Sequence, residues 1–143
     1  MSLTVQVARH ASDELLADLN RLLPQLSTSA PPLTIDGLER LIASPVVTLF
    51  VAANDGATVG TLTLVIFPIP SGLRAWIEDV VVDAASRELG VGAALTVAAT
   101  DEARERGVRS LDLTSRPSRE AANSLYRSLG FVQRETNVYR LSL

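Results

Sequence analysis

Apolar and polar residues follow two different periods along the chain, and these periods predict its secondary structure. Alternating or β-branched stretches, typical of strands, are "TVQVAR", "VVTLFVAA", "TVGTLTLVIF", "AWIEDVVV" and "RSLDLT". A helix is expected after the N-cap Ser12, because apolar residues recur at helical spacing in Leu15, Leu16, Leu19, Leu22 and Leu23. A second, shorter helix is expected from the N-cap Thr34 to about Ala43.

Turn-forming residues separate these elements. Prolines exclude helix and central strand from residues 24–33, which we expect to form a loop. Asn54, Asp55 and Gly56 accept the positive φ of a tight hairpin, so the strands on either side should be antiparallel neighbours. Residues 68–72, "PIPSG", predict another loop before "AWIEDVVV".

The second half of the chain predicts a parallel crossover. A helix is expected from Val91 to about Arg106, closed by Gly107, between the strands "AWIEDVVV" and "RSLDLT". A last helix should run from about Ser118 to Leu129, and "FVQRETNVYRLSL" should supply one or two closing strands. Residues 1–143 are therefore predicted to form a single domain of the α/β (α+β) class, with a mixed, mostly antiparallel sheet.

Composition excludes several function classes. The chain has no cysteine and one histidine, His10, so neither a thiolate site nor a multi-histidine centre is possible and no metal is expected. The net charge of −3 and the absence of a Lys/Arg cluster argue against nucleic acid as a partner. Without an apolar run of about 18 residues or a signal-peptide core, we expect no membrane contact and a cytoplasmic location.

The stretch "IEDVVVDAASRELGVGAAL", residues 77–95, joins a strand to a helix through a break with two glycines. Unpaired N–H groups at a helix start and the helix dipole favour an anion, usually phosphate. Gly90 and Gly92 allow a close backbone approach, and Arg87 offers a guanidinium, so "RELGVGA" predicts a pyrophosphate cradle. The alternative is a simple tight turn with a solvated Arg87. A P-loop is excluded because Ala93 and Ala94 stand where Lys-Ser/Thr belongs, and the glycines do not fit a Rossmann fingerprint.

The order of elements, the R-x-x-G-x-G core of "VVVDAASRELGVGAAL" and the later "NSLYRSLGF" resemble the GNAT superfamily of acyl-CoA-dependent N-acetyltransferases. The resemblance spans nearly the whole chain and is most specific over residues 76–132. It implies the GNAT fold, with a sheet splayed between its fourth and fifth strands and about four flanking helices. It also implies acetyl-CoA, and hence coenzyme A, as the cofactor.

The same resemblance implies which residues bind the cofactor. The amides of residues 87–93 would hold the pyrophosphate, and the backbone of Val80 and Val82 would pair with the pantetheine arm. A strand bulge, which the sequence does not locate, would let a backbone N–H, that of Val80, act as oxyanion donor. The cofactor-binding residues expected in this way are Val80, Val81, Val82, Arg87, Glu88, Leu89, Gly90, Val91, Gly92, Ala93, Asn123 and Tyr126.

Two catalytic residues are expected. Glu78 is the candidate base that deprotonates the amine, with Asp79 on the opposite face of a regular strand, or a water, as alternatives. Tyr126, in "LYRSLGF", matches the general acid of the family by position. Many relatives have an Asn seven residues earlier, where this chain has Arg119, which offers a phosphate contact instead.

Other candidate residues are assigned structural roles or left open. Tyr139 is expected to be structural and His10 to lie at the surface. Trp76 is expected either to line an acceptor pocket or to cover the core.

The resemblance predicts an enzyme that moves an acetyl group to a primary amine by direct attack in a ternary complex. A small metabolite or an amino acid is favoured as the acceptor, because the expected acceptor region lacks an acidic cluster for a polycationic peptide. The alternatives are a protein or peptide acetyltransferase, an acyl-CoA sensor without turnover, and a structural interaction domain. A monomer or a homodimer is expected, since the apolar C-terminal strand could pair across a dimer.

Overall fold

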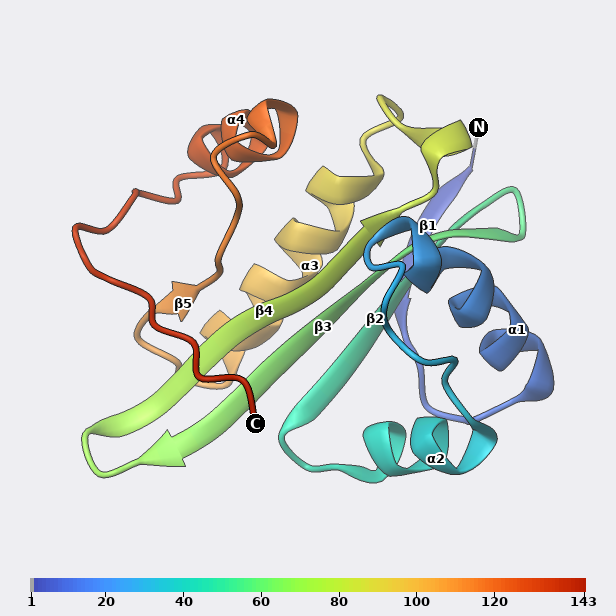
Figure 1. Ribbon diagram of the computed structural model, residues 1–143, viewed down its shortest axis with the longest axis horizontal. Helices are drawn as coiled ribbons and strands as arrows, with labels where there is room; N and C mark the ends of the chain where they lie inside the picture. The colour runs from blue at the N-terminus through green and yellow to red at the C-terminus, as the bar shows by residue number, and fades with distance from the viewer. Residues whose placement is uncertain (1) are drawn as a thin grey trace.

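The computed structural model describes residues 2–143 and contains one five-stranded sheet in the order β1-β2-β3-β4-β5 (Figure 1). Its strands are β1 Leu3–Val7, β2 Val47–Asn54, β3 Ala57–Ile69, β4 Gly72–Val82 and β5 Leu111–Asp112. Neighbouring strands from β1 to β4 are antiparallel, and β5 is parallel to β4. The predicted mixed α/β class and the parallel crossover are confirmed.

Four α-helices and two 3₁₀ turns complete the described chain. They are α1 Asp13–Leu22, η1 Leu23–Gln25, α2 Ile35–Ala43, η2 Ala84–Ser86, α3 Val91–Glu105 and α4 Glu120–Ser128. The predicted N-caps are confirmed, because the Leu15 N–H donates to Ser12 Oγ over 3.1 Å and the Gly37 N–H to Thr34 Oγ1 over 3.0 Å.

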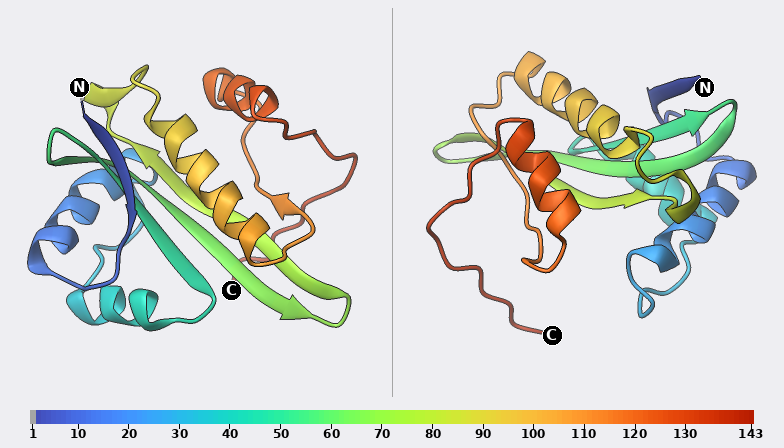
Figure 2. Two further views of the ribbon diagram at one scale, coloured as in Figure 1. Left: turned by 180° about the vertical axis from the view of Figure 1, so that it is seen from behind. Right: turned by 90° about the horizontal axis from the view of Figure 1, so that it is seen from above.

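The helices cover opposite faces of the sheet, with α3 on one side and α1 and α2 on the other (Figure 2). The α3 side holds the larger core, in which Leu62, Leu64 and Ile77 pack with Leu95 and Ala99 of the helix. The smaller core on the other side gathers around Leu19, Leu38 and Leu49. Figure 1 shows that α1 and α2 lie over the β1–β2 half of the sheet, which leaves the β3–β4 half of this face without a covering helix.

The loop predicted at residues 68–72 is wrong in extent. β3 continues to Ile69 and β4 begins at Gly72, so Pro68 pairs with Leu73 inside a long hairpin. A proline is tolerated there because this end of β3 runs beyond the last pair with β2, Val47 with Val65.

The prediction of closing strands in residues 131–143 is also wrong. This segment contains no strand within the described chain, and β5 is limited to two residues instead of the six of "RSLDLT". A strand needs a partner for its backbone groups, and the segment beyond Phe131 runs away from the sheet (Figures 1 and 2). We call residues 132–143 the C-terminal arm.

Candidate active site

A β-bulge on β4 sets the direction of the side chains at the candidate site. Glu78 pairs with Thr63 and Val81 pairs with Thr61, so Asp79 and Val80 together stand opposite one residue of β3. Asp79 has a φ of 48°, a left-handed value that a regular strand does not contain and that aspartate tolerates. The bulge that the sequence could not locate therefore lies at Asp79–Val80.

The bulge reverses which valines face α3. Val82 pairs with Gly60, whose missing Cβ would lie 2.8 Å from Val91 Cγ1 of α3, so Val82 is on the α3 side. Val81 then points to the other side, together with Glu78, because each lies opposite a threonine of the same β3 face. Glu78 therefore stays on the uncovered face of β4, and it is exposed.

The segment from the end of β4 through the first turn of α3, residues 83–93, is called the β4–α3 junction and presents a row of backbone N–H donors. Within residues 2–143, the N–H groups of residues 88–93 donate to no other group, and the first bond of α3 runs from the Ala94 N–H to the Gly90 carbonyl. The first turn of α3 also carries no acidic side chain. The junction is thus arranged as an anion site at the positive end of a helix of 15 residues.

The two glycines of the junction have different reasons to be there. Gly90 has a φ of 80°, a left-handed backbone conformation that glycine adopts without strain. A Cβ built on it meets nothing within 4 Å, so the space above this residue is open. A Cβ on Gly92 would lie 3.3 Å from Leu125 Cδ2, so this glycine lets α4 approach α3.

A cavity of about 570 Å³ connects the junction with β4 and α4. Arg87 and Arg119 bring positive charge to it, whereas Glu88 brings negative charge; Val80, Val82 and Leu125 are apolar parts of its wall. The full lining is Gln25, Leu26, Val80, Val81, Val82, Arg87, Glu88, Gly90, Val91, Gly92, Ala93, Arg119, Ala121, Ala122, Leu125 and Tyr126. The cavity thus suits an elongated ligand with an anionic portion beside the junction.

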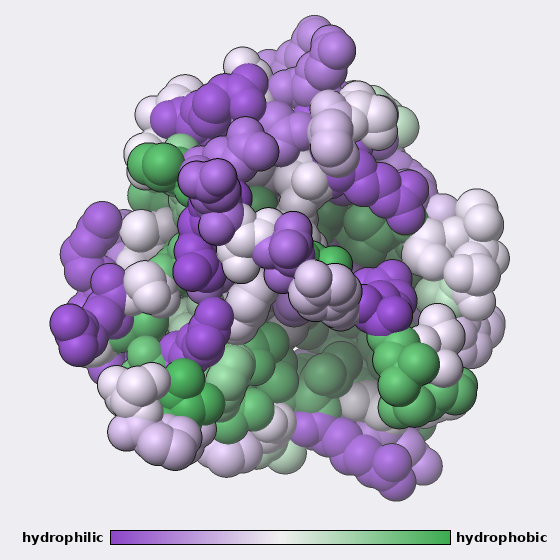
Figure 3. Space-filling model, turned by 60° about the vertical axis from the view of Figure 1, so that its left-hand side comes forward, coloured by the Kyte–Doolittle hydropathy of each residue, from purple (hydrophilic) through white to green (hydrophobic). Residues whose placement is uncertain are grey.

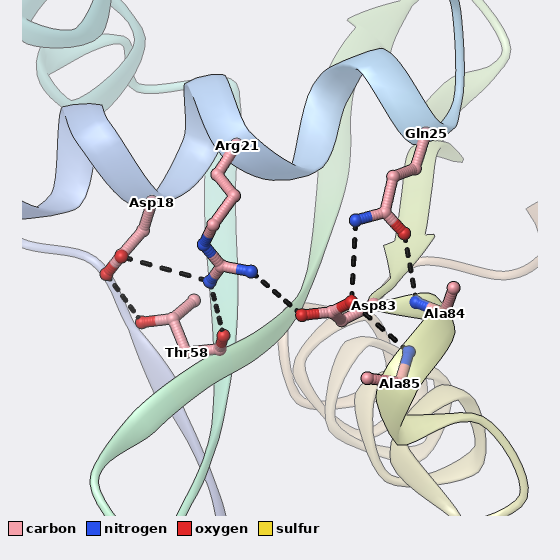
Figure 4. A network of polar contacts seen from close by, with 7 residues as sticks. All are labelled: Asp18, Arg21, Gln25, Thr58, Asp83, Ala84 and Ala85. Atoms are coloured by element: carbon pink, nitrogen blue, oxygen red, sulfur yellow. Dashed lines mark hydrogen bonds and ion pairs between the residues drawn. The ribbon is translucent and has the colours of Figure 1, made fainter.

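A polar network braces the start of the junction (Figure 4). Arg21 of α1 donates to Asp83 Oδ2 over 2.8 Å and to the Thr58 carbonyl over 2.7 Å. Gln25 accepts from the Ala84 N–H over 2.9 Å. The hydrogen bond from the Ala85 N–H lowers the pKa of Asp83 most; desolvation raises it, and Gln25 and Arg21 lower it, so that it lies below the ordinary 3.8.

Tyr126 of α4 borders the same cavity. Its ring meets Phe131 edge to face, with centroids 5.8 Å apart, and its carbonyl accepts from the Phe131 N–H over 3.0 Å. Burial raises the pKa of the Tyr126 hydroxyl, and the positive charge of Arg119 partly opposes this. The hydroxyl is therefore protonated at neutral pH.

Most predicted cofactor residues lie around this cavity, and a few candidates do not. Leu89 and Asn123 are not among its lining residues, and Asn123 donates to the carbonyls of Arg116 and Arg119, both over 2.9 Å. Asn123 thus fixes the chain before α4. Glu78 is also outside the lining.

Trp76 and His10 do not line this cavity. Trp76 is half-buried two residues before Glu78, and the Arg74 guanidinium stands 5.8 Å from the centre of its ring. Arg74 also pairs with Asp112 of β5 over 3.6 Å. His10 is exposed and borders a separate hollow beside β1, at the opposite edge of the sheet from β5.

Sequence reasoning missed Arg21, Gln25, Asp83 and Gly60. Asp83 is far from Arg21 and Gln25 in the sequence, so no local motif indicates that these three side chains meet. Gly60 could have been noticed as a glycine within a strand, which often marks a close approach.

Neither a membrane-spanning helix nor a cluster of metal-binding side chains is found in residues 2–143. No helix there is long and apolar enough to cross a membrane. No group of three His, Cys, Asp or Glu side chains in this part of the chain could hold a metal ion.

Comparisons with known proteins concern the family and the fold of the chain. The model of the acetyltransferase (GNAT) family matches residues 13–131. An acetyltransferase of Trypanosoma brucei is 28% identical, with a TM-score of 0.82 over 99% of this chain and 100% of that one. An aminoglycoside acetyltransferase from an uncultured soil metagenomic sample is 21% identical, with a TM-score of 0.86 over 99% and 95% of the two chains.

A ribosomal-protein-alanine N-acetyltransferase of Brucella melitensis is 20% identical, with a TM-score of 0.79 over 99% of each chain. At these identities the last two similarities establish a shared fold only. No functionally curated protein matches the sequence.

Proposed function

The chain belongs to the GNAT acetyltransferase family, and we propose that it transfers an acetyl group from acetyl-CoA to a primary amine of a small metabolite or amino acid, by direct attack in a ternary complex. The observation that supports this proposal best is one cavity lined by Glu88 and residues 90–93, whose amides are unpaired, by Val80 of the β4 bulge and by Tyr126.

The residues at the junction fit a coenzyme A diphosphate. Unpaired N–H groups, the arginines Arg87 and Arg119, and the open space above Gly90 all favour an anion held by backbone. The cavity continues to Val80 and Val82, whose backbone groups are available beside the bulge for an amide-containing arm. When bound, acetyl-CoA supplies the activated thioester.

Glu78 prepares the amine. A primary amine with a pKa of about 10.4 is some three units from its neutral form at pH 7, a deficit of roughly 4 kcal/mol. The Glu78 carboxylate, on the uncovered face of β4, accepts the proton directly or through a water. The Val80 N–H, at the bulge, donates to the carbonyl oxygen as negative charge develops there.

Tyr126 assists the departure of the sulfur. An ordinary tyrosine has a pKa about 1.5 units above that of a thiol, so full proton transfer to a thiolate costs roughly 2 kcal/mol. Burial raises the pKa of Tyr126 further. The hydroxyl is therefore best suited to donate a hydrogen bond to the leaving sulfur and to release its proton late.

The class of acceptor is inferred from the charged side chains near β4, after those that already have a partner within the chain are set aside. Arg21 is engaged by Asp83 and Thr58, and Arg74 by Asp112 and Trp76. The uncovered face of β4 carries Glu78 rather than an acidic cluster, which favours a singly charged amine over a polycation. The names of the structural neighbours include both a small-molecule and a protein acceptor.

A thiol-release assay with acetyl-CoA and a panel of amines tests the proposal. The panel contains amino acids, amino sugars, aminoglycosides and peptides with free N-termini. We expect release with a small amine and its loss in Glu78→Gln, with Thr63→Val as the control on the same face. Binding of acetyl-CoA without release by any amine would identify a sensor, and release with peptides alone would move the acceptor to proteins.

A further inference from the structure

The uncovered face of β4 carries further charged side chains beyond Glu78. Arg74, Trp76 and Glu78 alternate along β4 with residues that are buried in the larger core on the α3 side. Asp112 of β5 pairs in register with Trp76, and its carboxylate forms an ion pair with Arg74 over 3.6 Å. All four side chains therefore lie on the same face of the sheet.

On this face two guanidinium groups share one carboxylate. Asp112 Oδ2 lies 3.6 Å from Arg74 Nη2 and 3.9 Å from Nη1 of Arg134, which belongs to the C-terminal arm. Both distances are longer than a hydrogen bond, so Asp112 leaves the N–H donors of both arginines available. The side chain of Arg74 is 40% exposed and that of Arg134 61%, so an anion from solution can reach them. The three groups together carry one positive charge in excess.

The Arg74 guanidinium stands level with Trp76, closer to Glu78 than the position of Arg74 in the strand implies. It lies 5.8 Å from the centre of the Trp76 ring and beside Asp112, the residue that pairs with Trp76. Trp76 and Glu78 are two residues apart, a separation of about 7 Å along a strand. A positive group thus stands at this distance from the carboxylate of the proposed base.

The surface between these two charges is apolar. Trp76 pairs with Val65 of β3, and both side chains are partly buried on the uncovered face. Val65 also pairs with Val47 of β2, so apolar side chains continue across the sheet. Figure 3 shows a hollow on the side of the molecule with β5 and α4, bordered by hydrophobic side chains in its lower half. A short chain of methylene groups can therefore lie on Trp76 and Val65.

We propose that the acceptor amine carries an anionic group, a carboxylate or a phosphate, which Arg74 and Arg134 bind while the amine lies beside Glu78. The inference rests on the proposed function, which places the reacting amine at Glu78. In an α-amino acid a single carbon separates the α-nitrogen from the carboxylate, which is too short to span about 7 Å along β4. An extended chain of about four to six carbons with the amine and the anion at its ends fits this separation. Arg74 is then a residue that determines acceptor specificity.

Thiol release with matched acceptors tests the proposal. The acceptors are 4-aminobutyrate and 6-aminohexanoate, the neutral amides of both, glycine, and 3-aminopropylphosphonate, which carries the charge of a phosphate. We expect KM to be about fivefold lower for an anionic acceptor than for a matched amide, with similar kcat, because a hydrogen bond to a charged group is stronger. A lower KM for the phosphonate than for the acids assigns a phosphate, and the reverse order assigns a carboxylate.

The outcomes separate this inference from the proposed function. Release with equal KM for acid and amide overturns the inference alone, and a KM for glycine at or below that of the longer acids contradicts the spacer. No release with any amine overturns the proposed function, and the inference with it.

Substitutions separate recognition of charge from a structural role. Arg74→Gln should raise KM for the acids about fivefold without a change for their amides, and Arg74→Lys should restore part of the difference. Asp112→Asn should instead lower KM for the acids, since it removes the carboxylate that competes for both guanidiniums. Arg106→Gln is the matched control, because Arg106 is 39% exposed, pairs with Glu102 over 3.8 Å and lies at the end of α3. Equal effects of Arg74→Gln on acids and amides, or a higher KM in Asp112→Asn, contradict the proposal.

Discussion

The β4–α3 junction and the C-terminal arm differ in how the rest of the chain holds their backbone. The N–H of Asp83, where the junction begins, donates to the Val59 carbonyl over 2.8 Å, and its side chain is held by Arg21 and Gln25 (Figure 4). The arm, by contrast, is held by a long ion pair at Arg134. These contacts fix the backbone at the start of the junction, while the N–H groups of residues 88–93 remain unpaired. An anion site needs both a fixed backbone and free donors. In the arm the exposed groups are not held in this way.

Unpaired backbone groups therefore occur in two different settings in this chain. Around Gly90 they are few, most of their residues line a cavity, and they lie between fixed elements, which fits the proposed diphosphate. In the arm they lie along an exposed segment beside uncovered apolar side chains, where water or another extended segment can pair with them. Four predictions test this distinction, and they are ordered from the largest effect to the smallest.

Tyr126→Phe should lower kcat by about 100-fold and leave the affinity for acetyl-CoA unchanged, because the hydroxyl acts on the sulfur and not on the diphosphate. Steady-state kinetics and calorimetry measure the two effects. Because its pKa is raised above 10.0, the hydroxyl of Tyr126 should cause no loss of kcat below about pH 10. Tyr139→Phe is the control, and an unchanged kcat in Tyr126→Phe would remove Tyr126 from the mechanism.

Gly90→Ala should weaken acetyl-CoA binding by about tenfold, because the added Cβ fills the open space above Gly90 that the diphosphate would occupy. The left-handed backbone, which costs a residue with a side chain roughly 1–2 kcal/mol, should lower stability as well. Gly107→Ala is a matched control at the other end of α3, because its φ of 81° is nearly the 80° of Gly90 and its Cβ also meets nothing within 4 Å. Both variants should lose similar stability in thermal unfolding, but only Gly90→Ala should bind less tightly. Equal affinities would contradict the role of the junction.

Asp83→Asn should reduce the free energy of unfolding by about 1 kcal/mol at neutral pH, because a partly exposed carboxylate loses its charge-assisted bonds. The pKa of Asp83 is lower in the folded chain than the ordinary 3.8. Its contribution is therefore complete above pH 3.8 and is lost as the pH falls through the folded value. Urea unfolding of wild type and variant should converge at low pH, whereas a constant difference would show that the carboxylate charge is not the cause.

Leu141→Asp should change the affinity for acetyl-CoA by less than twofold, because the arm lies outside the cavity. Calorimetry of wild type and variant under identical conditions measures this difference. A large loss of affinity would show that the arm and the junction are coupled, and the distinction between the two regions would be wrong.

The sequence predicted local features of this fold well. Ser12, Thr34 and Gly107 mark helix ends through their own backbone preferences, and each is found where it was expected. Gly90 and the first turn of α3 were recognisable for the same reason, since a helix start and a positive φ depend on few neighbours.

Features that depend on distant partners were not predictable. In "IEDVVV" an extra residue could be inserted at any of several positions, and each position would send different side chains to each face of the sheet. The bulge at Asp79–Val80 is therefore defined only by the pairing of β4 with β3. The pair Arg21–Asp83 joins positions 62 residues apart. The pattern of residues 131–143 indicates a strand, but it does not indicate whether this chain supplies the neighbour.

The most direct test of the account is an NMR titration that follows the backbone amides of residues 88–93. Coenzyme A and pantetheine are compared, because pantetheine has the same arm and thiol but no diphosphate. The account predicts that coenzyme A shifts these amide resonances strongly and that pantetheine leaves them in place. Equal shifts with both compounds, or no shift of these amides by coenzyme A, would contradict the claim that the β4–α3 junction holds the diphosphate.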